Sequence, residues 1–340
     1  MSAVEVFLDD TPGETRGVIA RNGRYERLLI QRQSDPVALR LGSRSVGRVV
    51  DVSTGLRAAF VDLRAPSYGF LPLAKGQIVT VGQKIEVVVV AEPRETKGPI
   101  LRWLGVGEGE PRLLEAGPDV EARLKALAPG VEILTGLAAI HAGIEAEEEA
   151  LETQIVLPDL GLDVAVERTR ALVAVDIDHV GGGGRKGRDR ANLEGLRQAA
   201  RLIRLKSWGG LVAIDLAGAA QDPGVVRAAA RAAFGDDPDI AYGPQNRFGV
   251  VQLSLPWRDR PAEAWLMPRD PAVRIETTAI ALVRGARAAL LSNTTVARYD
   301  VICGEAEAGR VAPLLQRLGP RVGLTIDPAV SPGHGRIEET

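Results

Sequence analysis

Two aspartates close two short apolar segments of this chain and could share one task. Asp176 ends the run ALVAVD, and Asp215 ends the run LVAID. A helical pattern over residues 192–206 and a Gly-Gly turn at 209–210 connect the runs, which predicts a β-α-β unit with parallel strands. Because neighbouring parallel strands lie about 5 Å apart and end at the same sheet edge, the two carboxylates should converge.

Carboxylates held that close repel each other unless a cation lies between them. Their hard oxygens suit Mg²⁺, which one or two carboxylates and several waters hold in proteins, and Mn²⁺ is a substitute. Asp178 is near enough to orient a water or to serve as another ligand. We therefore expect Asp176 and Asp215 to be metal ligands and all three aspartates to be catalytic. The alternative is that each aspartate only caps the turn after a buried strand.

A basic segment follows the first aspartates. Gly181 to Gly184 precede Arg185, Lys186, Arg188 and Arg190, which predicts a mobile loop leading to a helix N-terminus, where a phosphate-bearing substrate would fit. The segment is neither a Walker motif nor a correctly placed GxGxxG fingerprint. The segment therefore gives little support to a nucleotide-binding protein. The alternative interpretation is a solvated loop without a binding function.

Short strands at close intervals between Arg44 and Trp103 predict a small closed barrel. Phe60, Tyr68 and Phe70 fall on two consecutive strands of it, with Arg48 and Lys97 nearby. Exposed rings beside cations bind single-stranded bases and phosphates, but Phe60 and Phe70 could equally be barrel core.

The other elements must support these two sites. Residues 3–32 predict an antiparallel strand pair, and residues 131–168 predict strands around a short helix at 146–151 that complete the same sheet. A helix at 225–234 and a strand at 248–255 follow the β-α-β unit. A proline-rich linker then leads to helices at 277–291 and 305–318, strands DVIC and RVGLTI, and a frayed tail, SPGHGRIEET.

Composition restricts the class of protein. The 340 residues carry 42 Lys+Arg and 44 Asp+Glu, a net charge of −2, so any nucleic-acid site must be a local patch. No signal peptide and no uncharged run near the roughly 18 residues of a membrane helix is present, which favours a cytoplasmic protein without membrane partners. With one cysteine, Cys303, and three scattered histidines, a multi-thiolate zinc site is excluded.

An ordered series of segments resembles the ribonuclease E/G endoribonucleases. The series comprises GRVVDVSTGLRAAFVDLRAPSYGFLPL, LETQIVLPDLGLDVAVERTRALVAVDID, ANLEGLRQAARLIRLKSWGGLVAID and NRFGVVQLS. The resemblance implies an α/β (α+β multidomain) protein in which an OB-fold RNA-binding barrel interrupts an RNase H-like subdomain. A DNase I-like catalytic subdomain and a small α/β C-terminal domain would follow. The expected ranges are 1–43 and 131–169 for the RNase H-like parts, 44–104 for the barrel, 105–130 for a connector, 170–258 for the catalytic subdomain and 259–340 for the C-terminal domain.

The resemblance also implies a function. Magnesium held by Asp176 and Asp215 would activate water to cut single-stranded RNA, leaving 5′-phosphate and 3′-hydroxyl ends. Phe60 and Phe70 would stack on a base, and Lys97 would touch RNA. The residues assigned to RNA binding are Arg48, Phe60, Tyr68, Phe70, Lys97, Arg185, Lys186 and Lys206.

Departures from the family pattern qualify this expectation. The connector stands where the family has a 5′-end sensor, so cleavage should not depend on the 5′ phosphate. No cysteine lies near residues 257–268, so no structural zinc and no zinc-linked tetramer is expected, while a homodimer stays open. Gly218 replaces a further acid. The rival reading is a non-catalytic RNA-binding or ribosome-associated protein that keeps the family scaffold.

Overall fold

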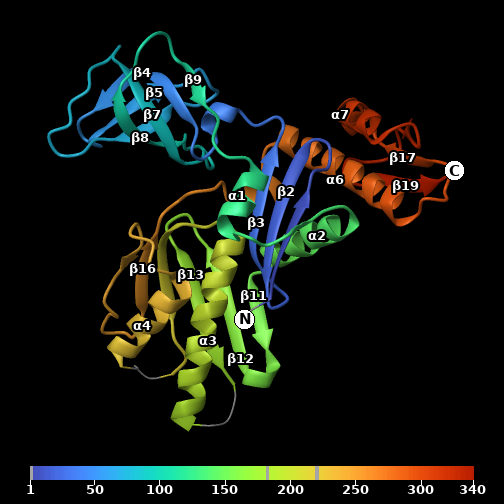
Figure 1. The fold of residues 1–340 in the computed structure, drawn as a ribbon. Coiled ribbons are helices and arrows are strands. Elements are labelled where there is room, and N and C mark those ends of the chain that lie inside the picture. The colour runs from blue at the N-terminus through green and yellow to red at the C-terminus, as the bar shows by residue number, and fades with distance from the viewer. Residues whose placement is uncertain (1–2, 181–183, 219–221) are drawn as a thin grey trace. The chain divides into compact units, whose positions relative to one another are not determined.

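The computed structural model describes residues 3–180, 184–218 and 222–340. The chain forms two compact units, a larger one of residues 1–147 and 260–340 and a smaller one of residues 148–259. Figure 1 labels most of their helices and strands. Across the described residues, no helix is both long and apolar enough to span a membrane.

The smaller unit is a six-stranded mixed sheet with two helices. The strand order is β11-β12-β13-β14-β16-β15. The elements are β11 (Gln154–Leu157), β12 (Leu162–Arg168), β13 (Val173–His179), α3 (Gly184–Leu205), β14 (Gly210–Asp215), α4 (Pro223–Phe234), β15 (Ala241–Tyr242) and β16 (Val251–Leu255), with a 3-10 turn at Pro158–Leu160.

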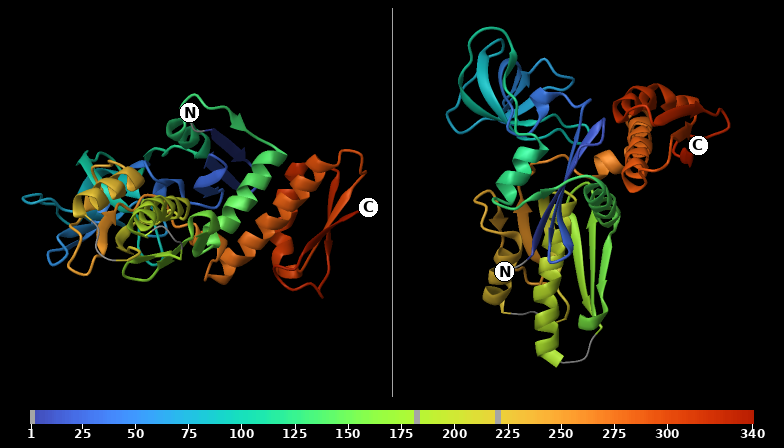
Figure 2. Two further views of the ribbon diagram at one scale, coloured as in Figure 1. Left: turned by 90° about the horizontal axis from the view of Figure 1, so that it is seen from below. Right: turned by 45° about the vertical axis from the view of Figure 1, so that its right-hand side comes forward.

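Strands β13 and β14 pair in parallel and α3 connects them, which confirms the predicted β-α-β unit. Alternation places Val173, Val175 and Ile177 in the core, where α3 packs against β12 and β13. Figure 2 shows α3 running along the strands of this sheet. The intervening residues of β13 therefore face away from the helix.

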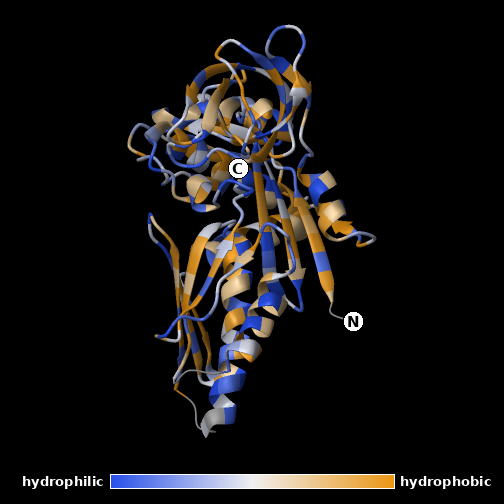
Figure 3. Cartoon of the chain, turned by 90° about the vertical axis from the view of Figure 1, so that its left-hand side faces the viewer, coloured by the Kyte–Doolittle hydropathy of each residue, from blue (hydrophilic) through white to orange (hydrophobic). Residues whose placement is uncertain are grey.

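Helix α3 begins earlier than predicted. Residues 184–190 form its first turns, and only Gly181 to Gly183 of the glycine run lie outside the described residues. Arginine and lysine are good helix formers, so the basic segment extends the helix despite Gly187. The first turns of α3 are hydrophilic, as Figure 3 shows.

The first sheet of the larger unit has the order β10-β1-β2-β3. Its elements are β1 (Val4–Asp9), β2 (Glu14–Arg21), β3 (Arg24–Arg32), α1 (Val120–Leu127), β10 (Ile133–Leu134) and α2 (Leu137–Leu151). Val6, Ile19 and Leu29 form its core with Val120 and Leu124 of α1. The predicted antiparallel start is therefore confirmed.

One strand of residues 131–168 completes the first sheet as expected, since β10 pairs in parallel with β1, but two other expectations about this range were wrong. The run LAAI belongs to α2, which is longer than the predicted helix at 146–151. Strands β11 and β12 do not join the first sheet; β12 pairs along its length with β13 of the smaller unit. Strands β11, β12 and β13 are consecutive and antiparallel, so short turns join each strand to its neighbour in the smaller unit's sheet.

The barrel strands are β4 (Arg44–Ser53), β5 (Ala58–Asp62), β6 (Gly69–Pro72), β7 (Lys84–Ala91), β8 (Ile100–Val106) and β9 (Arg112–Glu115), with a 3-10 turn at Val37–Leu39 before them. The pairing of β5 with β4 closes the order β5-β6-β8-β7-β4 into a ring, and β9 adds to β4. The closed barrel is confirmed, but its sheet extends into the expected connector.

The C-terminal part packs helices on a three-stranded sheet ordered β18-β17-β19. Its elements are α5 (Glu263–Leu266), α6 (Pro271–Ser292), β17 (Tyr299–Cys303), α7 (Glu305–Leu315), a 3-10 turn (Gln316–Leu318), β18 (Val322–Ile326) and β19 (Arg336–Glu339). The tail is not frayed, because β19 pairs antiparallel with β17.

Candidate functional site

Asp176 and Asp215 occupy paired positions on adjacent parallel strands. They are register partners in the β13–β14 ladder, and both side chains are exposed. Because Val175 and Ile214 beside them are buried under the helices, alternation puts both carboxylates on the opposite face of the sheet. The convergence expected from the sequence is confirmed at the level of strand register.

Other carboxylates influence the protonation of Asp176. Partial burial raises the pKa of Asp176, and repulsion from Asp178, Asp215 and Asp163 raises it further. Carboxylates that repel each other in this way favour a bound positive ion. The donor set, carboxylate oxygens on an exposed face, fits Mg²⁺.

Asp178 lies one alternation further along β13, on the same face as Asp176 and opposite Asp163 in the β12–β13 register. In the part of the chain that the structure describes, no group of three or more His, Cys, Asp or Glu side chains is close enough to hold a metal ion. A cation at this site would therefore have the Asp176–Asp215 pair as its protein ligands and water for the rest, which is the usual arrangement for Mg²⁺.

The basic start of α3 follows β13 directly. Lys186 is exposed there, whereas the Arg185 side chain lies outside the described residues. A Cβ atom built on Gly218 would lie 2.9 Å from Cδ and 3.1 Å from Nε of Arg188. Arg188 thus packs against the chain just after Asp215, so cationic and anionic groups gather at one end of the β-α-β unit.

Asn192 fixes the segment after Asp215, a role that the sequence reading missed. Its side chain is 1% exposed, donates from Nδ2 to the Ala217 carbonyl at 3.1 Å and accepts from the Ala217 N–H at 2.9 Å. The Asn192 amide thus satisfies both the N–H and the carbonyl of Ala217, as a neighbouring strand would. The available signal was an asparagine at the start of an otherwise apolar helix face.

Two phenylalanines of the barrel, Phe60 and Phe70, lie on its outer face. Ala59, Val61 and Leu71 belong to the barrel core, so alternation places Phe60 and Phe70 on the outer face. The two residues are register partners, and their rings meet edge to face at 5.8 Å between centroids. Both are half-buried, and the interpretation of these rings as barrel core is wrong.

Tyr68 directly precedes β6 and is more exposed than Phe60 and Phe70. It is 57% exposed and lies beside Gly98, where a Cβ atom would come within 1.9 Å of the Tyr68 carbonyl oxygen. Lys97, in the turn before β8, is exposed. Arg48 is less available, since it pairs with Glu110 at 3.2 Å, as do Arg64 at 3.5 Å and Lys84 at 2.6 Å.

With these sites described, known proteins offer a comparison. No family model matches the chain. A stretch of 119 aligned residues is 32% identical to a protein of Haemophilus influenzae. That protein is ribonuclease G. The alignment covers 29% of this chain and 24% of ribonuclease G, so the chain spans about a quarter of the length of the curated relative that it matches. This distant, partial similarity suggests a relation to the ribonuclease E/G family.

The structure contradicts one assigned RNA contact. Lys206 is 2% exposed, and its Nζ donates to the carbonyls of Ala150, at 2.7 Å, and of Glu152. The same ammonium lies 5.0 Å from the centroid of the Trp208 ring. A buried cation satisfied by carbonyls and an aromatic face stabilises the fold and does not present charge to RNA.

Proposed function

We propose that the chain is a magnesium-dependent endoribonuclease of the ribonuclease E/G type, in a short form that cleaves single-stranded RNA. The observation that carries the proposal is the register pairing of Asp176 with Asp215 on an exposed sheet face, with carboxylate repulsion that a cation would relieve. The partial similarity to ribonuclease G supports the same reaction class.

Acidic and basic side chains of the smaller unit have separate roles in this proposal. Asp176 and Asp215 would hold Mg²⁺, which when bound polarises a phosphate oxygen and makes a bound water more acidic. Asp178, on the same face, orients the attacking water. Lys186 and Arg188, at the start of α3, attract the RNA backbone beside the acids. Hydrolysis would leave 5′-phosphate and 3′-hydroxyl ends.

The barrel would hold the strand. Phe60, Phe70 and Tyr68 provide a sequence-tolerant stacking surface, and base stacking on such rings contributes about 1–3 kcal/mol per base. Lys97 adds charge next to Tyr68. In this proposal the barrel is an OB-fold, the first sheet is the RNase H-like subdomain and the β-α-β unit belongs to the DNase I-like subdomain. The proposed enzyme has no 5′-end sensor and no zinc link between its domains.

One observation favours the rival, a non-catalytic RNA-binding protein. Among the described residues the acids do not form a three-ligand group, whereas the outer aromatic face of the barrel needs no metal. Such a protein would bind single-stranded RNA through Phe60 and Phe70 and leave it intact.

Product analysis separates the two functions. Purified protein is incubated with an internally labelled A/U-rich single-stranded RNA and with the same sequence as a duplex, with and without Mg²⁺. The proposal expects internal cuts only in the single strand, only with Mg²⁺ or Mn²⁺, at the same rate for 5′-monophosphate and 5′-hydroxyl substrates. RNA that is bound but stays uncut would establish the rival.

A further inference from the structure

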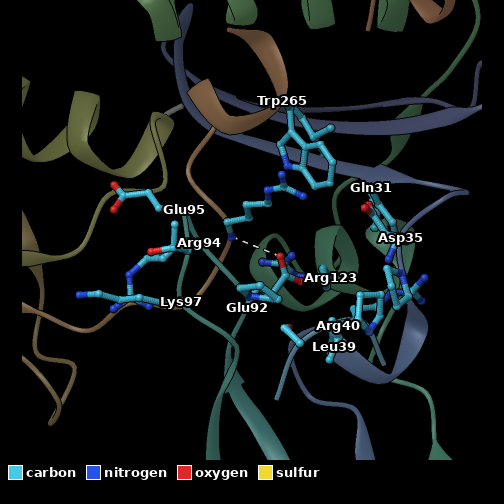
Figure 4. Close-up of a pocket in the computed structure, with 18 residues that line it drawn as sticks. Gln31, Asp35, Leu39, Arg40, Glu92, Arg94, Glu95, Lys97, Arg123 and Trp265 are labelled. Carbon is cyan, nitrogen blue, oxygen red and sulfur yellow. Dashed lines mark hydrogen bonds between the residues drawn. The ribbon is translucent and has the colours of Figure 1, made fainter. Parts of the chain in front are cut away.

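A cavity of about 310 Å³ lies within the larger unit, between the base of the barrel, strand β3, helix α1 and the segment that leads into α5. Figure 4 shows its lining. The volume is at the lower end of the range of small-molecule sites. None of the three aspartates of the metal site lines this cavity, whereas Lys97, proposed above to bind RNA beside Tyr68, does.

Basic side chains outnumber acidic ones in its wall. The five basic residues are Arg40, Arg94, Lys97, Arg123 and Arg260, and the three acidic ones are Asp35, Glu92 and Glu95. In Figure 4, Arg94 and Lys97 approach from the barrel side and Arg40 from the opposite side. Because Arg40 already donates to the Gly117 carbonyl at 3.5 Å, an anionic ligand would meet its cations from the barrel side.

The two inner acids already serve the surrounding backbone. Glu92 accepts from the N–H of Leu41 at 3.1 Å and from the N–H of Arg260 at 3.2 Å. Asp35 accepts from the N–H of Arg32 at 2.8 Å. These carboxylates hold the loops that shape the cavity, so they offer little to a bound cation.

Arg260 lacks full compensation for its burial. Its guanidinium carbon lies 3.8 Å from the centroid of the Trp265 ring, and Trp265 is 5% exposed. Burial and repulsion from Arg32 together lower the pKa of Arg260 more than Asp35, Glu92 and Glu276 raise it. A second anion in the cavity would favour the charged form of this side chain.

The remaining wall is apolar, with one hydroxyl that lacks a partner. Ile30, Leu39 and Val120 line one side with prolines at 36, 66 and 93. The Oγ atom of Ser67 is buried and makes no hydrogen bond among the described residues. Buried hydroxyls are normally satisfied, so this one suggests a group that arrives with a ligand.

From this combination we infer that the cavity binds a phosphorylated nucleoside, either free or as one unit of an RNA chain. The phosphate meets Arg94, Lys97 and Arg123, the flat base packs on the apolar wall and the Arg260 guanidinium, and a sugar or base group bonds with Ser67. Arginine planes stack on bases as aromatic rings do.

The test is calorimetric titration of the full chain with AMP, UMP, adenosine and inorganic phosphate. We expect both nucleotides to bind, and Arg123→Glu to weaken them about tenfold or more, as expected for a lost charge-assisted contact. Ser67→Val should weaken binding less and serves if Arg123→Glu does not fold. Arg24→Glu, at an exposed position of the first hairpin, is the matched control and should bind like the wild type.

Three results of the titration would overturn the inference. Phosphate binding as tightly as AMP would overturn the nucleoside part, and no binding of any probe, or equal binding by Arg123→Glu, would overturn the site. Displacement by AMP of a fluorescent eight-nucleotide RNA identifies the RNA chain as the source, and no displacement identifies free nucleotide. Because no catalysis is measured, the titration is informative even if the nuclease proposal fails.

Discussion

Asp176 and Asp215 are register partners on β13 and β14, the only parallel strand pair that the structure describes in the smaller unit's sheet. Both aspartates are exposed. The pairing converts two separate sequence positions into one site. Partial burial raises the pKa of Asp176, and repulsion from Asp178, Asp215 and Asp163 raises it further.

The first prediction concerns this repulsion. A carboxyl whose pKa is higher in the folded than in the unfolded state binds its proton more tightly when folded, so it lowers stability as pH rises above its ordinary value. Without divalent metal, Asp176→Asn should therefore have a higher Tm than wild type at pH 7, with the difference vanishing near pH 3. Asp236→Asn, at an exposed position in the same unit, should show no rise.

Added Mg²⁺ should reverse that order. A ligand that binds only the folded state raises its stability with concentration. Scanning calorimetry should show a Tm that increases with Mg²⁺ for the wild type and stays constant for Asp176→Asn. An equal increase in both proteins would contradict binding at this pair.

A second prediction concerns the buried ion network of the larger unit. Glu14 accepts from Nε of Arg16 at 2.6 Å, Nε of Arg32 at 2.7 Å and Nη2 of Arg284 at 2.7 Å. Burial raises the pKa of Glu14, but the three arginines together outweigh burial and hold it far below its ordinary value. Stability from Glu14 is therefore present above its ordinary pKa and is lost as pH falls below it.

Glu14→Gln should consequently destabilise the larger unit by about 3 to 5 kcal/mol, because it leaves buried arginines uncompensated. Urea unfolding at pH 7 measures this. The control Glu5→Gln changes an exposed position of β1 and should cost little. Similar unfolding midpoints for the two variants would show that the network contributes nothing.

A third prediction concerns Asn192 as a positioning residue. Asn192→Ala leaves the N–H and carbonyl of Ala217 unsatisfied, which should cost about 1–3 kcal/mol. If Asn192 positions the chain after Asp215, the Mg²⁺ concentration for half-maximal cleavage should also rise severalfold. Gln198→Ala removes a 5% exposed amide from the same helix and should leave the metal dependence unchanged. A shared shift in both variants would indicate general loosening of α3.

A fourth prediction concerns the barrel surface. Phe60→Ala and Phe70→Ala should each weaken binding of single-stranded RNA by about 1–3 kcal/mol in fluorescence anisotropy, since each removes a stacking ring. Phe248→Ala, 73% exposed in the smaller unit, is the matched control. Unchanged affinity in both barrel variants would assign these rings to another role.

The sequence predicted what repeats regularly. Alternation around Phe60 and the apolar runs before Asp176 and Asp215 led to the barrel and the β-α-β unit, because side-chain periodicity follows strand geometry. Lys206 was wrongly assigned to RNA binding. A lysine at a helix end has the same local sequence pattern whether its ammonium group is exposed to solvent or bonded to buried carbonyls. The Asn192–Ala217 bonds join residues that are 25 positions apart, and no local rule specifies them.

The most direct test of the account is the cleavage rate of one labelled single-stranded RNA at saturating Mg²⁺ for four proteins. The wild type and Asp236→Asn should cut it at equal rates, while Asp176→Asn and Asp215→Asn should bind it normally and cut it at least a hundredfold more slowly. Equal cleavage by all four proteins would show that this pair does not hold the catalytic metal. No cleavage by the wild type, with RNA still bound, would show that the chain is not a nuclease.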